Sequence, residues 1–239
     1  MDLKEEELLG GAISDHWYYA SKARAMLASL PRAEGLRVLD VGAGSGFFSR
    51  WLLQQGAADS AICVDPGYER DHEEIVNGRP LRFRRDVGKT DANLVLMMDV
   101  LEHVDDDTGL LSEYLAKAAP DADLFITVPA FQFLWSHHDE FLEHRRRYTI
   151  STARQMIERA GARAHGLHYY FGAVFPLAAM VRLLGRLRQH QGSNMRPQHP
   201  VVNAILKAAC AVERIVMRAN RLAGLSVICL CRRKDLAAG

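Results

Sequence analysis

Short apolar runs recur along this 239-residue chain and alternate with segments of helical composition. Each run has the length of a buried strand, and the runs lie at about 37–41, 60–65, 81–85, 92–98, 122–128, 162–170 and 225–232. Strands that alternate with helices predict a parallel sheet with helices on both faces. The pattern therefore predicts an α/β fold with a doubly wound, mostly parallel, seven-stranded Rossmann-like sheet, which binds its ligand at the carboxyl ends of the strands.

Helix signals divide the chain into four parts. Pro31 ends an amphipathic helix at 13–30, and a later helix is expected to run from Ser151, as its cap, to a stop at Gly161. The parts are an N-terminal cap helix at 1–35, the ligand-binding core at 36–170, a helical insertion at 171–224, and the last strand with a tail at 225–239.

A glycine turn follows the first strand. Gly42, Gly44 and Gly46 stand at every second position, so they form a turn that side chains do not obstruct and a ligand can approach closely. A dinucleotide fingerprint has the different spacing GxGxxG, which places a pyrophosphate on a helix N-terminus. Asp40 would repel a pyrophosphate, but it suits a ligand with an ammonium group. An ordinary tight turn between strand and helix is the structural alternative.

S-adenosylmethionine (SAM) has an ammonium group and no phosphate, and this segment resembles motif I of the class I SAM-dependent methyltransferases. Asp65 ends the second strand, where a carboxylate accepts hydrogen bonds from two ribose hydroxyls. It can also be a turn-forming residue before Pro66. Residues 81–87 resemble the family's third strand, whose terminal acid contacts the adenine amino group. Residues 99–104 match the segment that lines the methionine half of SAM.

The resemblance implies S-adenosyl-L-methionine as cofactor and S-adenosyl-L-homocysteine as product. It also implies that the last two strands form an antiparallel pair. His103 is open to a second interpretation, as a residue on a helix surface. The implied cofactor residues are Asp40, Gly42, Ala43, Gly44, Gly46, Asp65, Pro66, Asp86, Val87, Met98, Asp99, His103, Trp17 and Lys22.

Two of these residues belong to an aromatic and basic cluster before the first strand. Residues 16–22, His-Trp-Tyr-Tyr-Ala-Ser-Lys, resemble a bacterial subgroup of the family. Lys22 can pair with the SAM carboxylate, and Trp17 or Tyr18 can cover the sulfonium through a cation–π contact. The alternatives are aromatic packing on the core for Trp17 and a solvated side chain for Lys22.

The loop after the fifth strand resembles the same subgroup, with its pattern PA…W…HDE…H.RRYT. Such a loop lies beside the SAM methyl group and holds the acceptor. His138 is the candidate general base, because an unperturbed imidazole titrates near neutrality. Asp139 or Glu140 would orient His138, and His144 is the alternative base. The implied substrate residues are Tyr18, Phe131, Trp135, His137, Arg147 and Tyr148, with Arg146 beside them as a further anion-binding cation.

A plain surface helix is the alternative for this loop. If 138–148 is helical, Asp139 with Glu143 and Glu143 with Arg147 stand one turn apart and form an ordinary salt-bridged face. No metal is expected, because His137, His138, Asp139 and His144 lack a fixed ligand spacing.

The insertion carries two amphipathic segments. The apolar run at 171–188 is interrupted by Pro176 and Arg182 and is too short to span a membrane. A long helix is predicted at 201–223, after a polar linker. It would bury its wide apolar face against the domain or a twin subunit, against an apolar acceptor, or in an anionic membrane with cations at the headgroups. Its narrow polar stripe is Asn203, Lys207, Arg214, Arg218 and Arg221.

Composition limits the partners and the compartment. The net charge of +1 gives no overall field that favours nucleic acid. The four cysteines form no CxxC pair, and the acidic residues 1–7 do not have the pattern of a signal peptide. We therefore expect a reduced, cytoplasmic location, with peripheral contact at the inner membrane face or a homodimer through 171–224.

The combined interpretation is a SAM-dependent methyltransferase that acts on a small-molecule or lipid-like acceptor, with oxygen as the first choice and nitrogen or carbon still open. The alternatives are other SAM chemistry on a quinone or lipid-type substrate, and a non-catalytic SAM-binding protein. An NAD-dependent oxidoreductase shares the fold but needs GxGxxG, which the glycine turn does not have.

Overall fold

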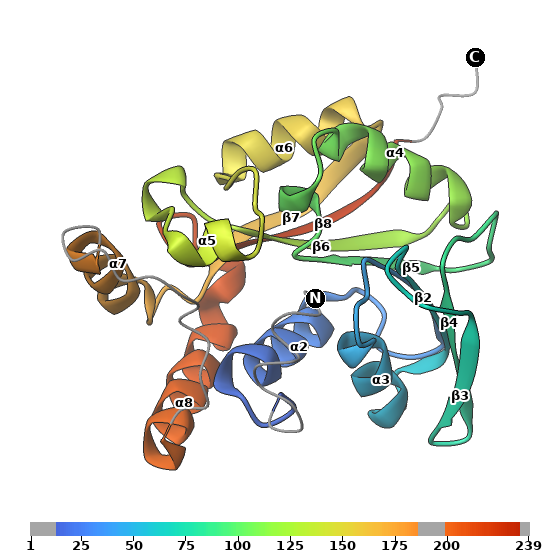
Figure 1. The fold of residues 1–239 in the computed structure, drawn as a ribbon, viewed down its shortest axis with the longest axis horizontal. Helices are drawn as coiled ribbons and strands as arrows, with labels where there is room; N and C mark the ends of the chain where they lie inside the picture. The colour runs from blue at the N-terminus through green and yellow to red at the C-terminus, as the bar shows by residue number, and fades with distance from the viewer. Residues whose placement is uncertain (1–12, 186–198, 235–239) are drawn as a thin grey trace.

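The structure is a computed structural model that describes residues 13–185 and 199–234 (Figure 1). The expectations for the acidic residues 1–7, most of the polar linker, and the tail beyond 234 lie outside the described residues. The predicted α/β class is confirmed. One mixed sheet has eight strands in the order β3-β4-β2-β1-β5-β6-β8-β7. The strands are β1 (Leu36–Val41), β2 (Ala58–Val64), β3 (His72–Val76), β4 (Arg79–Arg84), β5 (Leu94–Met98), β6 (Asp123–Pro129), β7 (Ala162–Tyr170) and β8 (Ser226–Arg233).

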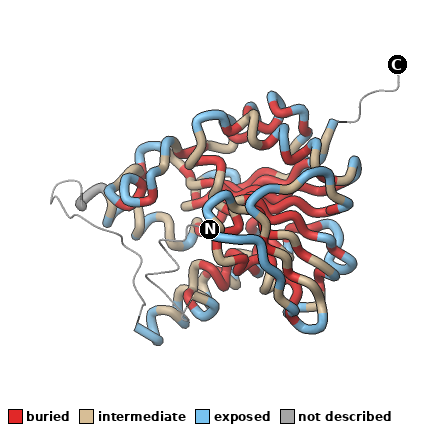
Figure 2. The backbone as a smooth tube through the Cα atoms, turned by 45° about the vertical axis from the view of Figure 1, so that its right-hand side comes forward, coloured by how far each residue is buried: buried red, intermediate tan, exposed pale blue. Residues whose placement is uncertain are grey.

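Helices cover both faces of the sheet, as Figure 1 shows. On one face lie α2 (Trp17–Ser29) and α3 (Phe47–Gln54), and on the other lie α4 (Asp107–Lys117) and α6 (Ile150–Arg159). Buried residues gather in the strands and on the helix sides that face them (Figure 2). β5 and β6 are buried along nearly their whole length, as expected for parallel strands covered on both sides.

The central strands place the site. β1 pairs in parallel with β2 on one side and with β5 on the other. The chain therefore reverses its winding direction between β1 and β5, and the turns after these two strands open into one crevice. The predicted antiparallel pair of last strands is also present, since β7 pairs antiparallel with β8.

The sheet has one strand more than predicted. β3 is an edge strand that pairs antiparallel with β4 across a tight hairpin at Asn77 and Gly78. Both turn residues have positive φ, 51° and 74°, which is the geometry that Asn-Gly turns favour. The strand has only two apolar residues, Ile75 and Val76, so its hydrophobic pattern is weak.

The predicted cap of α6 is wrong by two residues. Thr149, rather than Ser151, accepts the hydrogen bond from the N–H of Thr152, and the Thr152 hydroxyl receives one from the N–H of Thr149. The predicted stop at Gly161 is confirmed, with φ of +83°.

The insertion forms α7 (Phe175–Gly185) and α8 (Pro200–Val216), followed by the short helix η4 (Met217–Ala219). α8 packs against α2 through its polar stripe. The Asn203 amide oxygen accepts from the N–H of Trp17 at 2.8 Å, Lys207 pairs with Asp15, and Arg218 donates to the carbonyl of Ala28. Of the three burials considered for this helix, packing of its apolar face on its own domain is therefore wrong over much of its length, and the alternatives of a twin subunit, an acceptor and a membrane stay predictions.

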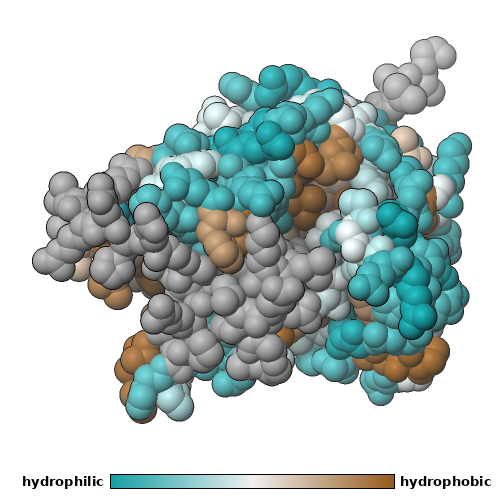
Figure 3. Space-filling view, in the orientation of Figure 1, coloured by the Kyte–Doolittle hydropathy of each residue, from teal (hydrophilic) through white to brown (hydrophobic). Residues whose placement is uncertain are grey.

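Apolar side chains of both insertion helices lie at the surface, where brown patches appear at the lower left of Figure 3. Ile215 is 84% exposed. The other strongly exposed members are Leu177, Met180, Val181, Val201, Val202, Ile205, Val212 and Val216. No helix among the described residues is long and apolar enough to cross a membrane.

Candidate functional site

The glycine turn has the backbone geometry that its spacing predicts. Gly42, Gly44 and Gly46 have φ of 61°, 52° and 72°, a region that side chains other than glycine rarely adopt. A Cβ on Gly42 would lie 2.8 Å from the Val100 side chain, and one on Gly46 would lie 3.0 Å from the ring of Phe83. The turn therefore packs closely on its neighbours, and its glycines cannot be replaced without strain.

Acidic side chains lie at the ends of the strands around this turn. Asp40 is buried and accepts a hydrogen bond from the Ser49 hydroxyl at 2.8 Å. Burial raises the pKa of the Asp40 carboxyl to about 6. Asp65 accepts from the N–H of Gly44 at 3.1 Å and from the N–H of Gly67 at 2.9 Å. Asp65 thus shapes the turn, and both of its interpretations are compatible with this position beside the glycines.

The remaining adenosine-side residues are less enclosed. The Asp86 side chain is 83% exposed and pairs with Lys117 at 3.1 Å, so nothing in this arrangement directs it at a bound adenine. Val87 is half-buried and packs on the core. Ala43 is buried inside the glycine turn, whereas Pro66 is exposed in the turn after β2.

A buried ion pair closes the crevice after β5. Lys22, only 1% exposed, pairs with Asp99, which also accepts from the hydroxyls of Thr127 at 3.1 Å and Tyr18 at 3.3 Å. Burial opposes the charged ammonium, but the Asp99 carboxylate outweighs burial and raises the pKa of Lys22 above its ordinary value. Lys22 is therefore not a solvated side chain. Its ammonium pairs with the Asp99 carboxylate, whereas the sequence predicted a pair with the carboxylate of SAM. Met98 lies fully buried just before Asp99.

A cavity of about 450 Å³ opens beside Asp99. The insertion helices supply an apolar wall, and the turns after β5 and β6 supply a polar wall. Trp17 and Tyr18 line it as well, each packed against the ring of Phe171. The apolar wall includes Leu177, Ala178, Val181, Val202 and Leu206, and the polar wall includes Asp99, Glu102, His103, His138, His144 and Arg147.

Asp139 is the hub of the polar wall. It is fully buried in α5 (His137–Phe141) and receives two hydrogen bonds from Arg147, at 2.7 and 3.0 Å. It also faces Nδ1 of His144 at 2.9 Å and receives bonds from the N–H and hydroxyl of Ser136. Burial opposes the carboxylate, but the bonds from His144 and Arg147 outweigh it and hold the pKa of Asp139 well below its usual range.

This network corrects two expectations for the loop. Asp139 orients His144 rather than His138, and Glu140 pairs with the exposed His137. The surface-helix alternative is wrong, because α5 ends at Phe141 and Glu143 has a positive φ of 58°. That turn lets the chain double back, so His144 reaches Asp139.

Several expected substrate residues lie elsewhere. The Tyr148 hydroxyl is buried and donates to Asp107 at 2.8 Å, so Tyr148 supports the loop from beneath. Arg147 lines the cavity, but Asp139 and the carbonyl of Ala130 occupy its guanidinium. Phe131 stacks on Tyr169. Phe131, Trp135 and His137 do not line the cavity described above.

Two polar residues that line the cavity were missed by sequence reasoning. Glu102 is fully buried, and neither carboxylate oxygen has a hydrogen-bond partner among the described residues. Burial and then the Asp99 charge raise the pKa of Glu102 well above its ordinary value. Arg182 of α7 reaches Asp139 at 4.0 Å and donates to the carbonyl of Leu134. The sequence feature that could have indicated Arg182 is its position as a single cation within the apolar run at 171–188.

The site's donor set fits a ligand that carries amino and hydroxyl groups and no phosphate. Carboxylates end β1 and follow β2 and β5 around an unobstructed turn, and carboxylates accept from both kinds of donor. A carboxylate beside Nδ1 of an imidazole favours the tautomer whose Nε2 lone pair faces a partner, and Asp139 lies beside Nδ1 of His144 in this way. The adjoining cavity combines apolar area with a few convergent polar groups, as small-molecule sites do.

Comparison with known proteins agrees with this geometry. The methyltransferase domain family matches residues 15–165. The ubiquinone biosynthesis O-methyltransferase of Hahella chejuensis is 32% identical over 112 residues. That alignment covers 42% of this chain and 44% of the relative, so the chain spans less than half of that protein's length.

Solved structures share the fold at low sequence identity. One is a chain of the Haloferax volcanii complex between the Trm112 methyltransferase activator and a methyltransferase, with a TM-score of 0.59 at 16% identity, covering 98% of this chain and 95% of that one. Another is an S-adenosylmethionine dependent methyltransferase from Mesorhizobium loti, with a TM-score of 0.56 at 15% identity, covering 91% and 100%. At these identities the likeness extends to the fold.

Proposed function

This chain belongs to the methyltransferase domain family of SAM-dependent enzymes, and from that membership we propose that it methylates a hydroxyl oxygen on an apolar acceptor. The cavity carries the proposal. It lies at the crevice between β1 and β5, beside the turn after β5, and α7 and α8 make one wall of it apolar. A hydroxyl on a hydrophobic body is the acceptor that suits such a wall.

The name of the Hahella relative supports oxygen as the methylated atom and a quinone-type ring as the acceptor body. Oxygen also suits the polar wall, where imidazoles and carboxylates face the cavity. When bound, SAM supplies a methyl carbon on a sulfonium, to which the acceptor oxygen bonds as the carbon–sulfur bond breaks and its electron pair goes to sulfur.

The chain's own residues position the acceptor and remove its proton. His138 lines the cavity and is the proposed proton acceptor from the hydroxyl. Tyr18 and Trp17 form the aromatic side of the cavity, and the Lys22–Asp99 pair holds the turn after β5 in place. The apolar wall provides a nonpolar surface for the body of the acceptor, and fixed positioning contributes a large part of such a rate enhancement.

Isothermal titration with SAM and then with NADH tests the cofactor. We expect SAM to bind and NADH not to bind, and absence of SAM binding would refute the proposal. A screen of phenols and prenyl-substituted phenols with labelled SAM identifies the acceptor. His138→Ala should keep the affinity for SAM and lower turnover about 10²–10⁴-fold. Unchanged turnover would remove His138 as the base.

We also propose that the acceptor enters from a lipid surface. The inner sides of α7 and α8 line the cavity, whereas their outer sides expose apolar residues such as Ile205 and Ile215. The cations Lys207 and Arg218 are engaged by α2 and the loop before it, so apolar insertion, rather than headgroup pairing by these two, would dominate the contact.

A further inference from the structure

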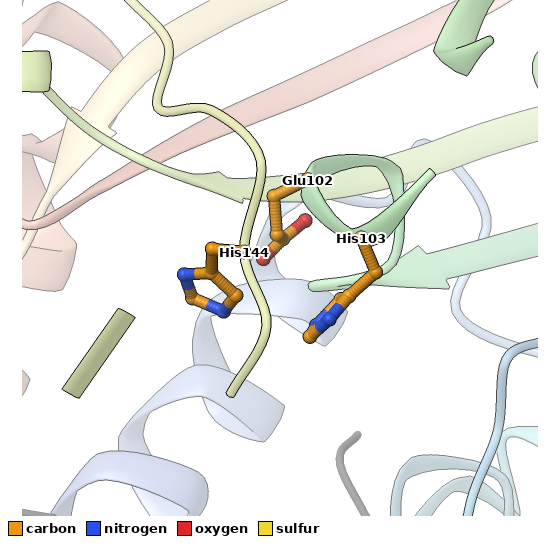
Figure 4. A group of neighbouring side chains, drawn as sticks. All are labelled: Glu102, His103 and His144. Atoms are coloured by element: carbon orange, nitrogen blue, oxygen red, sulfur yellow. The ribbon is translucent and has the colours of Figure 1, made fainter. Parts of the chain in front are cut away.

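Three side chains converge in the polar wall of the cavity (Figure 4). Glu102 and His103 belong to the short helix η2 (Leu101–His103) after β5, and His144 belongs to the segment after α5. One potential ligand atom from each residue lies within 4.8 Å of the other two. The two imidazole rings are 4.7 Å apart and meet nearly at a right angle, so they do not stack.

Glu102 is the buried carboxylate that the surrounding protein leaves unsatisfied. Asp40, Asp99 and Asp139 each accept hydrogen bonds from protein donors, whereas both Glu102 oxygens lack a partner among the described residues. An unsatisfied buried carboxylate is costly unless a cation or a donor compensates it. Figure 4 shows the Glu102 carboxylate beside the two histidines, with one of its oxygens on the side of His144.

The protein prepares His144 to donate a lone pair. Nδ1 of His144 lies 2.9 Å from the Asp139 carboxylate, an acceptor that favours the tautomer with the proton on Nδ1 and the Nε2 lone pair available as a ligand. Carboxylate–histidine pairs of this kind orient metal-binding imidazoles. Asp139 itself is fixed by Arg147, so the orientation does not depend on solvent.

Arg145 joins the two segments that carry these residues. Its backbone N–H donates to the carbonyl of Glu102 at 2.7 Å, and its Nε donates to the carbonyl of His103 at 2.9 Å. His144, the preceding residue, is thereby held beside η2. The three side chains thus converge through a backbone arrangement that the fold fixes.

We propose that Glu102, His103 and His144 bind one divalent first-row transition ion, with its open coordination position facing the cavity. One carboxylate and two imidazoles suit Zn²⁺, Mn²⁺, Co²⁺ or Fe²⁺, whereas Mg²⁺ and Ca²⁺ prefer sites made of oxygen ligands. A tetrahedral ion with bonds of about 2.1 Å needs ligand atoms about 3.4 Å apart, so the side chains move inward on binding.

Metal binding by Glu102, His103 and His144 does not depend on the proposed function, but a role of the metal ion in catalysis rests on that function. An ion in the open position would hold the acceptor oxygen and ease loss of its proton to His138. The ion would therefore act as a Lewis acid on the acceptor and would not alter SAM binding directly.

Metal binding is tested on protein freed of metal by dialysis against a chelator. Titration with Zn²⁺, Mn²⁺ and Co²⁺, with Mg²⁺ for comparison, measures stoichiometry and affinity, and Co²⁺ adds a visible absorption band that reports nitrogen ligation. We expect one transition ion per chain, with Mg²⁺ at least about 10-fold weaker. Glu102→Gln, His103→Ala and His144→Ala should each weaken binding about 10–100-fold.

His165→Ala is the matched control, because His165 lies on β7 near Asp123, at the opposite end of β6 from the site. It should leave metal affinity unchanged. His103 is half-buried, so His103→Ala is the variant that keeps the test decisive if the others fail to fold. Absence of transition-metal binding, or equal affinity in His103→Ala, overturns the inference and leaves Glu102 as a protonated carboxyl. SAM titration of the same metal-free protein tests the proposed function separately.

Discussion

Replacement of Asp139 by alanine should destabilise the protein far more than a surface substitution does. Asp139 is fully buried and pairs with Arg147 through two hydrogen bonds. Its loss leaves the buried Arg147 guanidinium without a carboxylate, and Arg182 at 4.0 Å loses the same counter-charge. The charged form of Arg182 is already destabilised, since burial and then the Arg147 charge lower its pKa to about 10.

The expected size follows from this burial. Removal of one partner of a buried ion pair costs about 3–5 kcal/mol, because the other charge stays buried and unpaired. A second cation in the same pocket places Asp139→Ala toward the upper end of that range. The measurement is the free energy of unfolding in urea, followed by circular dichroism and by tryptophan fluorescence to check that the two transitions coincide.

Glu140 provides the matched control in the same short helix. It pairs with His137 at 2.9 Å, but both side chains are about half exposed, at 59% and 48%. Glu140→Gln should therefore change the unfolding free energy by less than about 0.5 kcal/mol. The double variant Asp139→Ala/Arg147→Met should lose less than the sum of the two single losses. A loss below about 1 kcal/mol for Asp139→Ala would refute the reasoning.

Three further predictions concern other parts of the fold. Burial, followed by the charges of Arg221 and Arg218, lowers the pKa of His168 to about 4, so the unfolded chain takes up a proton first as pH falls from 6.5. The free energy of unfolding of the wild type, measured in urea, should fall by up to about 3 kcal/mol between pH 6.5 and 4, and that of His168→Leu should not show this fall. Parallel pH profiles for the two proteins would contradict this prediction. Gly42→Ala places a side chain on a residue with φ of +61°, so it should lower the free energy of unfolding by about 1–2 kcal/mol. It should also weaken SAM binding at least about 10-fold in a titration, and an unaltered affinity for SAM would contradict this prediction. The protein should float with anionic vesicles and Ile215→Glu should float less, whereas wild type that stays at the bottom of the gradient would exclude the lipid surface.

Local patterns were sufficient to predict the central sheet. Apolar residues dominate the central strands, most completely in β5, and Gly42 and Gly161 adopt the positive φ that glycine supports. The missed strand β3 is an edge strand with one face in solvent, so packing imposes little hydrophobic pattern on it. Its Asn77-Gly78 turn was the usable signal.

The site was harder to predict, because its contacts join distant segments. Asp139 meets Arg147 only because Glu143 turns the chain left-handed, and a helical wheel cannot anticipate that turn. Lys22 and Asp99 were each recognised, but their pairing across 77 positions depends on how α2 crosses the sheet. The absence of a partner for Glu102 is a property of the assembled fold and has no signature in a single sequence.

The position of the last strand has a consequence for synthesis on the ribosome. β8 lies between β6 and β7, so until residues 226–233 emerge β7 has no neighbouring strand and β6 is paired only with β5. The 55 residues between Tyr170 and Ser226 take about 3–11 s to translate at 5–20 residues per second. During that interval β6 presents an open edge, which is a template for pairing with another nascent chain. The insertion therefore delays closure of the sheet, and a protecting chaperone would be most useful to this protein at that stage.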